Sequence, residues 1–247
     1  MLIEHLRFLG NRLFRWRSWT FLLAALFLIL ERNRFYYPFG SHAVDILFEM
    51  GCFGVSMIGI VIRGITIGHI PKGTSGRNTK RQKAACLNMT GLYSITRNPL
   101  YLGNYVIFLG LSLLSQSWEI VTINTFLFVA AYVPIILVEE NFLLQRFDHE
   151  YRQYASRVPC LIPKPWLWQS PNQAWNWRMV LRREHDTFFA ILLSFLAIRQ
   201  LREYIIAGQT NLDWPCLIIG LVGAALWSTL KTLKRHTKLL SPAPTAG

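Results

Sequence analysis

The chain of 247 residues has few charged side chains, and few of those are acidic. Only 16% of its residues are Asp, Glu, Lys or Arg, whereas soluble domains average about a quarter. Its 13 Asp and Glu stand against 26 Lys and Arg, which gives a formal net charge of +13. With 52% hydrophobic residues and a mean hydropathy of +0.29, this composition indicates a membrane protein whose basic surface faces anionic headgroups.

Paired cysteines are also missing. Cys52, Cys86, Cys160 and Cys216 form no CxxC pair, so the sequence indicates neither a disulfide framework nor a thiolate zinc site, and we expect no metal. After the first apolar run the sequence ERNR at 31–34 takes the place of a small-residue cleavage site. We therefore expect that run to stay in the chain rather than to be removed as a signal peptide.

Apolar runs recur along the chain, and they lie at 18–30, 44–62, 99–115, 120–138, 187–207 and 214–230. The first gives only about 20 Å of helix against a hydrocarbon core of about 30 Å, so it spans only if it extends past its ends or its flanking arginines reach the headgroups. Residues 1–17 repeat leucine at helical spacing with arginines between, which favours an interfacial helix over a frayed basic tail. The sequence therefore predicts an all-α polytopic membrane helix bundle of about six transmembrane helices with amphipathic interfacial helices.

Basic residues gather on one side of this layout. Most of the 26 Lys and Arg fall in 1–17, 63–98, 139–185 and 231–247, and cytoplasmic loops carry the excess of such residues. Both termini and these loops are therefore expected on the cytoplasmic side.

The segment 159–177 has an unusual composition. It holds four tryptophans and four prolines, namely Trp166, Trp168, Trp175, Trp177, Pro159, Pro163, Pro165 and Pro171. Proline breaks helices and tryptophan prefers the membrane–water boundary, so we expect this segment to lie in the inner headgroup layer.

The stretch GLYSITRNPLYLGNY at 91–105 places polar residues at the start of the third apolar run, and Glu139 and Glu140 end the fourth. Only a short turn separates these runs, so we expect an antiparallel hairpin whose far ends meet. Two carboxylates at the edge of hydrocarbon are costly unless they meet donors or water, so the meeting point is a candidate functional site. The alternative is that Pro99 only begins a helix and the glutamates end one in solvent.

An amphipathic pattern follows the glutamates. Leu143, Phe147, Tyr151 and Tyr154 form an apolar-aromatic stripe at helical spacing, and Pro159 ends it. The stripe predicts a cytoplasmic helix, although most such stripes serve packing alone.

A second group of charges falls at the outer ends of two apolar runs, and it comprises Asp45, Glu49, Arg199, Arg202 and Glu203. Charges in the membrane pair with one another, so we expect pairing across helices. Arg199 and Glu203, four apart, could also pair within one helix. We favour a structural role over an outer-leaflet lipid site.

The motifs resemble those of a known superfamily. GLYSITRNPLYLGNY, followed further along by EENFLLQRFDHEYRQYASRVPCLIP, is similar to the signature of the isoprenylcysteine carboxyl methyltransferase and phospholipid methyltransferase superfamily, whose members are integral membrane enzymes that use S-adenosylmethionine. The resemblance covers residues 85–165, as a helical hairpin plus a cytoplasmic helix. Residues 1–84 would hold the interfacial helix and two spans, and residues 166–247 the Trp-rich segment and two more.

The resemblance implies a set of site residues. The catalytic ones would be Arg97, Asn98, Tyr101 and Glu140. The cofactor S-adenosylmethionine would be bound by Tyr93, Arg97, Asn98, Pro99, Tyr101, Gly103, Glu139, Glu140, Tyr151, Tyr154 and Arg157. Asn98 stands where the isoprenylcysteine branch usually has histidine, whereas the phospholipid branch more often has Asn-Pro-x-Tyr, which weakens the case for a protein carboxylate as acceptor.

We therefore expect a multi-pass membrane methyltransferase with a cytoplasmic active site. Its acceptor would be a lipid or lipid-linked molecule with an acidic phosphate or carboxylate headgroup, entering from the cytoplasmic leaflet. Its other partner would be an anionic membrane surface, without nucleic acid or metal. Two alternatives stay open. One is a membrane NADPH-dependent sterol-type reductase, which shares a similar motif arrangement, and the other is a non-enzymatic transporter or scaffold.

Overall fold

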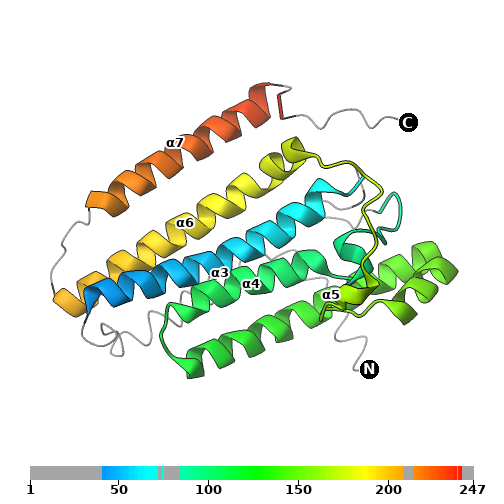
Figure 1. Cartoon of the computed structure of the whole chain (residues 1–247), viewed down its shortest axis with the longest axis horizontal. Coiled ribbons are helices and arrows are strands. Elements are labelled where there is room, and N and C mark those ends of the chain that lie inside the picture. The colour runs from blue at the N-terminus through cyan, green and yellow to red at the C-terminus, as the bar shows by residue number, and fades with distance from the viewer. Residues whose placement is uncertain (1–40, 72–73, 75–83, 209–213, 238, 241–247) are drawn as a thin grey trace.

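The computed structural model describes residues 41–71, 74, 84–208, 214–237 and 239–240. Over these residues the regular structure is helical, with one isolated bridge between Gly91 and Gln169 and no strand. The long helices, labelled as in Figure 1, are α3 (His42–Gly68), α4 (Pro99–Leu113), α5 (Trp118–Arg157), α6 (Trp177–Ala207) and α7 (Trp214–His236), and the 3₁₀ turns are η3 (Leu92–Ser94) and η4 (Pro165–Leu167). The interfacial helix expected at 1–17 and the span expected at 18–30 lie outside the described residues.

Three of these helices are long and apolar enough to cross a membrane, namely α3, α5 and α7. The apolar α4 has 15 residues, which is short for a span. The fifth helix, α6, carries charged residues toward both ends, so only its middle is apolar; these are Arg178, Arg182, Arg183, Glu184, Asp186, Arg199, Arg202 and Glu203. The described helices thus form an all-α integral membrane bundle, and they do not support the expected six spans.

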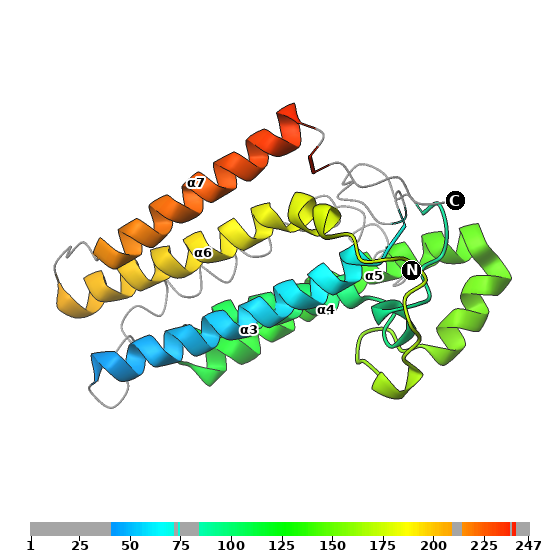
Figure 2. The same ribbon diagram turned by 45° about the horizontal axis from the view of Figure 1, so that its top comes forward.

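The helices run side by side, with α3 packed between α4 and α6, and α7 packed on α6 (Figures 1 and 2). Small residues line the contact between α3 and α4. A Cβ atom added to Gly59 would lie 2.6 Å from the carbonyl oxygen of Gly103, and Gly110 faces Ser56. Since lipid supplies no hydrophobic drive between helices, such close backbone packing is a main source of helix association in membranes.

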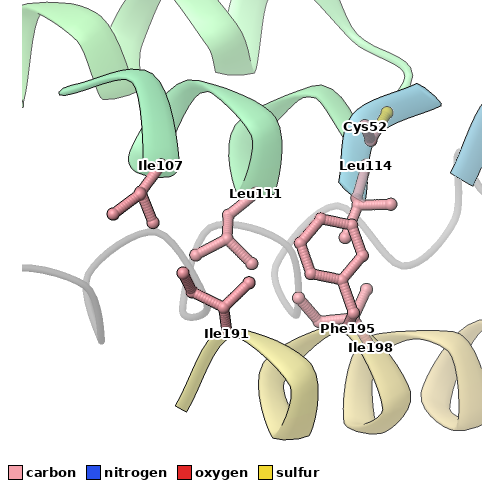
Figure 3. Close-up of a cluster of buried hydrophobic side chains, with 7 residues drawn as sticks. All are labelled: Cys52, Ile107, Leu111, Leu114, Ile191, Phe195 and Ile198. Carbon is pink, nitrogen blue, oxygen red and sulfur yellow. The ribbon is translucent and has the colours of Figure 1, made fainter. Parts of the chain in front are cut away.

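A cluster of buried side chains joins α3, α4 and α6. Figure 3 shows its members, which are Cys52, Ile107, Leu111, Leu114, Ile191, Phe195 and Ile198. The ring of Phe195 also meets that of Phe53 edge-on, with centroids 5.2 Å apart. This cluster fixes α6 against the α3–α4 pair along its apolar middle.

The predicted hairpin is present. Residues 114–117 connect α4 to α5, and the Ser117 hydroxyl caps α5 by accepting from the N–H of Ile120 at 3.3 Å. Aromatic rings meet between the two helices, where Tyr105 and Phe108 of α4 lie 5.3 and 5.5 Å from Phe128 of α5, measured between ring centroids. The start of α4 and the later part of α5 are therefore held at the same end of the bundle.

Helix α5 is longer than the apolar run 120–138. It continues through Glu139 and Glu140 to Arg157, with a break at Asp148, where φ is 30° and ψ is −100°. The cytoplasmic helix predicted from the aromatic stripe is thus an extension of the span that turns back at Asp148. Helix α3 ends, and helices α4 and α6 begin, at one end of the bundle. We call this end the site end and the opposite end the far end.

Candidate active site

The loop 91–98 leads into α4 at the site end. Gly91 begins it with φ of 63°, a left-handed conformation that glycine adopts without strain. The N–H of Gly91 donates to the carbonyl oxygen of Gln169 at 2.9 Å, which ties the loop to the segment before α6. Pro99 occupies the first turn of α4, where its missing N–H is not needed.

Arg97 joins this loop to both halves of α5. Its Nε and Nη2 donate to the Glu140 carboxylate at 2.8 and 3.2 Å, and its Nη1 donates to the carbonyl oxygens of Ala155 and Val158 at 2.7 and 3.2 Å. Burial alone would lower the pKa of the Arg97 guanidinium, but the Glu140 carboxylate outweighs it and raises that pKa. Arg97 is therefore a permanently charged clamp that closes the hairpin.

Asn98 and its neighbour Thr96 fasten the chain that follows α5. The Asn98 Nδ2 donates to the carbonyl oxygen of Cys160 at 3.0 Å and lies 3.5 Å from its Sγ. The Thr96 hydroxyl donates to the carbonyl oxygens of Cys160 and Leu161 at 3.2 and 3.1 Å. Cys160 thus lies beside the Arg97–Glu140 pair. The sequence did not predict this position, because Cys160 belongs to no recognisable cysteine motif.

Three tyrosines of the predicted set line the same region. The Tyr154 hydroxyl donates to the carbonyl oxygen of Tyr93 at 2.7 Å. Tyr151 lies beside the Arg97–Glu140 pair, where its phenol interacts with the Glu140 carboxylate, but its buried hydroxyl makes no hydrogen bond of regular geometry within the described part of the chain. Burial raises the pKa of all three phenols, and the Glu139 or Glu140 carboxylates add to this, so they stay protonated at neutral pH.

The remaining predicted site residues lie in different environments. Tyr101 is buried and meets Tyr132 edge-on with centroids 5.2 Å apart. Gly103 faces α3, because an added Cβ would lie 2.9 Å from the carbonyl oxygen of Gly59. Glu139 is half-buried and Arg157 is exposed. Gly103 therefore serves the packing of α3 on α4, and the other three remain near the hairpin end.

A chain of polar side chains crosses four helices beneath this region. Arg63 on α3 donates to Glu184 on α6 through Nε and Nη2, at 2.8 and 2.7 Å, and through Nη1 to the Asn104 side chain on α4. The Asn104 Nδ2 in turn donates to the hydroxyl of Tyr132 on α5 at 3.2 Å. These residues belong to none of the sequence motifs. A charged residue inside an apolar helix, such as Arg63, is nevertheless itself an indication of a functional or structural site.

The predicted pairing at the far end is confirmed. Arg202, 1% exposed, donates to Asp45 at 2.6 Å and to Glu49 at 2.8 Å. Arg199 donates to the same Glu49 at 2.5 Å. Glu203 lies 3.2 Å from the His42 ring, so this network joins α3 and α6 at the far end.

Comparison with known proteins bears on the hairpin. Residues 72–150 match the family model described as phospholipid methyltransferase. The Protein-S-isoprenylcysteine O-methyltransferase of Saccharomyces cerevisiae is 30% identical over 129 residues, which are 50% of this chain and 52% of that protein. This segment belongs to the isoprenylcysteine carboxyl methyltransferase and phospholipid methyltransferase superfamily. The matched residues 72–150, which we call the methyltransferase core, contain loop 91–98, α4 and both glutamates.

Two bacterial relatives have names that refer to metal resistance. The Cobalt-zinc-cadmium resistance protein CzcN of Cupriavidus metallidurans is 30% identical over 155 residues, 62% of this chain and 63% of that protein. The Nickel-cobalt-cadmium resistance protein NccN of Alcaligenes xylosoxydans xylosoxydans is 29% identical over 117 residues, 47% of this chain and 54% of that protein. The chain thus spans less than two thirds of each of these relatives. No solved structure matches it.

Proposed function

We propose that the protein transfers a methyl group from S-adenosylmethionine to a lipid or lipid-linked acceptor with an acidic oxygen, a phosphate or a carboxylate. The observation that carries this proposal is the meeting of the two motifs of the methyltransferase core at the site end, where Arg97 bridges the loop and Glu140. Tyr93, Tyr151 and Tyr154 close around the same junction.

The junction fits a polar cofactor in one respect that is independent of family. The Tyr151 hydroxyl is buried beside the Glu140 carboxylate and makes no hydrogen bond of regular geometry within the described part of the chain. A buried hydroxyl without such a bond costs about 1–3 kcal/mol unless a ligand binds it. Glu139 and Glu140 stand at the same place, and carboxylates accept hydrogen bonds from ribose hydroxyls and from an ammonium group. In this proposal Tyr151 and the two glutamates hold the cofactor, and the Arg97 clamp keeps Glu140 in position.

The reaction places few demands on proton transfer. The acceptor oxygen would bond to the methyl carbon of the cofactor's sulfonium while the carbon–sulfur bond breaks and its electron pair stays on sulfur. An anionic oxygen has no proton to lose, so the site needs no general base. This agrees with its chemistry, because burial raises the pKa of the Tyr93, Tyr151 and Tyr154 phenols, and these donate hydrogen bonds rather than remove protons.

Sidedness follows from the same proposal. S-adenosylmethionine is made and kept in the cytoplasm, so the site end would face that side. The segments 63–98 and 139–185, which contain the site, are rich in Lys and Arg, and the positive-inside rule assigns such segments to the cytoplasm.

The test is calorimetric titration of the full chain in lipid nanodiscs with S-adenosylhomocysteine, the stable product. The proposal expects binding, and it expects Tyr151→Phe to weaken binding about 2- to 10-fold because one hydrogen bond is lost. Tyr105→Phe is the matched control, since the Tyr105 hydroxyl lies 3.3 Å from Thr125, away from the junction. Glu140→Gln should also weaken binding. Absence of binding in both nanodiscs and detergent would overturn the proposal, and binding of NADPH instead would favour the reductase.

A further inference from the structure

Residues 159–177, which we call the ledge, join α5 to α6 across the site end (Figures 1 and 2). The ledge has little regular structure beyond η4, yet backbone hydrogen bonds hold it along its length. The N–H of Lys164 donates to Ile95, and that of Asn176 donates to Gly68, both at 2.9 Å. With the Gly91–Gln169 bond, these contacts fasten the ledge to the site loop and to the end of α3.

The ledge directs large apolar side chains away from the protein. Ile162 and Trp166 are 80% and 76% exposed, and about half of the surface of three further tryptophans is free, namely Trp168, Trp175 and Trp177. Burying apolar surface is worth roughly 25 cal/mol per Å², and aromatic rings are the largest such surfaces. One face of the Trp175 ring packs against Gly68 and His69 at the end of α3. The remaining apolar surface of the ledge, above all that of Ile162 and Trp166, is left for an outside partner to cover.

The position of the ledge identifies that partner as lipid. The ledge lies where α3 ends at Gly68, where α4 begins at Pro99 and where α6 begins at Trp177, which is the level at which membrane helices leave the hydrocarbon. Tryptophan concentrates at this boundary because its ring is apolar and its N–H is polar. Interfaces with other proteins are also rich in tryptophan. Lipid is favoured here because the ledge lies directly at the ends of the helices that form the membrane bundle.

Charge on the ledge fits the same partner. Lys164 is exposed beside Trp166, and the Arg178 guanidinium lies over the Trp177 ring, 5.5 Å from its centroid. Basic side chains near a membrane surface are attracted by anionic headgroups, at about 1 kcal/mol each. Apolar rings directed toward acyl chains and cations directed toward phosphates are the chemistry of an interfacial segment.

We propose that the ledge is a lipid-binding surface, with Ile162 and the four tryptophans inserted at the headgroup–acyl boundary of the leaflet at the site end. Because the same segment holds loop 91–98, the ledge sets the depth of the candidate site at the level of lipid headgroups. Resting on the proposed function, this identifies the acceptor as a molecule resident in that leaflet, whose reacting group lies in the headgroup layer.

The experiment uses the full chain in nanodiscs and the fluorescence of Trp166. The difference between the wild type and Trp166→Phe reports this one ring. The ledge proposal expects that lipids brominated near the headgroup end of their acyl chains remove most of this signal, and that acrylamide, a water-soluble quencher, removes little. Trp118, which is 78% exposed at the start of α5 at the far end, is the matched reference, tested with Trp118→Phe.

A signal quenched by acrylamide but not by brominated lipid would overturn the proposal, because the ledge would then face water. Ile162→Trp in the Trp166→Phe background provides a second reporter if the first substitution disturbs folding. Titration of Trp166→Phe with S-adenosylhomocysteine keeps the two proposals separate. Failure of lipid quenching with intact binding would overturn the ledge proposal and leave the methyltransferase proposal standing. Lipid quenching without binding of S-adenosylhomocysteine to the wild type would overturn the methyltransferase proposal, and the acceptor with it, and leave the ledge as a lipid-binding surface.

Discussion

Arg97 and Glu140, 43 positions apart in the chain, form a two-point salt bridge with donor–acceptor distances of 2.8 and 3.2 Å. The bridge closes the α4–α5 hairpin at the site end. The remaining Arg97 nitrogen also holds the carbonyl oxygens that end α5, at Ala155 and Val158. One guanidinium therefore fixes both the meeting of the two motifs and the return of α5 after Asp148.

Replacing Arg97 by lysine should loosen the end of α5 selectively. A lysine keeps the charge but lacks the planar fork that serves a carboxylate and two carbonyls at once. Breaking a buried ion pair costs roughly 3–5 kcal/mol, and the partly exposed Arg97 should cost less. We expect faster amide exchange over 149–158, measured by hydrogen–deuterium exchange with mass spectrometry. Arg152→Lys is the control, since the Arg152–Asp148 pair is exposed and such pairs contribute little.

Gly59→Ala should separate α3 from α4. An added Cβ would lie 2.6 Å from the carbonyl oxygen of Gly103 and 2.7 Å from the Ile107 side chain, so the backbones must move apart. Overpacking of this kind costs typically about 1–3 kcal/mol. Gly54→Ala on the same helix has nothing within 4 Å and should be neutral or stabilising by up to about 1 kcal/mol. The measurement is the free energy of unfolding in mixed micelles, and equal values for the two variants would contradict the packing described.

The sequence predicts the hairpin because two apolar runs with four residues between them have only one way to pack, and this fixes Arg97 near Glu140. It does not predict the pair Arg63–Glu184, whose partners are 121 positions apart. That pairing depends on how α6 lies against α3, which the apolar cluster of Figure 3 determines. The same dependence on packing explains Gly103, which the motif assigns to the cofactor and the structure places against α3.

The far-end network should show strong coupling between Arg202 and Asp45. Arg202→Leu leaves the Asp45 carboxylate buried without its cation, which for a buried pair costs roughly 3–5 kcal/mol. Arg202→Leu with Asp45→Leu removes both charges and leaves Glu49 paired with Arg199. The double variant should therefore be less destabilised than the sum of the two single variants, by about 0.5–3 kcal/mol in an unfolding cycle. Additive losses would show that the pair contributes no coupling.

Asn104→Leu should lower cofactor affinity if the proposed function holds. It should also lower stability, because it removes one hydrogen bond from the Arg63 guanidinium and one from the buried Tyr132 hydroxyl. The Asn104 side chain is hydrogen-bonded to both Arg63 and the Tyr132 hydroxyl, and the Tyr132 ring packs against Tyr101. Asn104 therefore links the Arg63 side chain to a residue of the candidate site. Losing one such hydrogen bond corresponds to about 1 kcal/mol, or about a fivefold change in affinity. The measurement is titration with S-adenosylhomocysteine.

The control for this relay is a second buried asparagine on the same hairpin. Asn124 donates to Ser112 at 3.1 Å toward the far end, with no link to the site. Asn124→Leu should therefore change thermal stability and leave affinity unchanged. Equal loss of affinity in both variants would mean that helix packing in general, rather than the relay, governs binding.

Cys160 should react slowly with iodoacetamide, and its rate should depend on Glu140. Burial first, and then the Glu140 carboxylate, raise the pKa of this thiol above its ordinary value. A raised pKa means less thiolate at a given pH, and the thiolate is the reactive form. Glu140→Gln removes the negative charge and leaves the Arg97 cation nearby, so the pKa should fall and alkylation at pH 8 should accelerate. Cys86, which is exposed, serves as the internal reference in the same digest, read by mass spectrometry. A Cys160-to-Cys86 rate ratio unchanged by Glu140→Gln would show that burial alone controls the thiol.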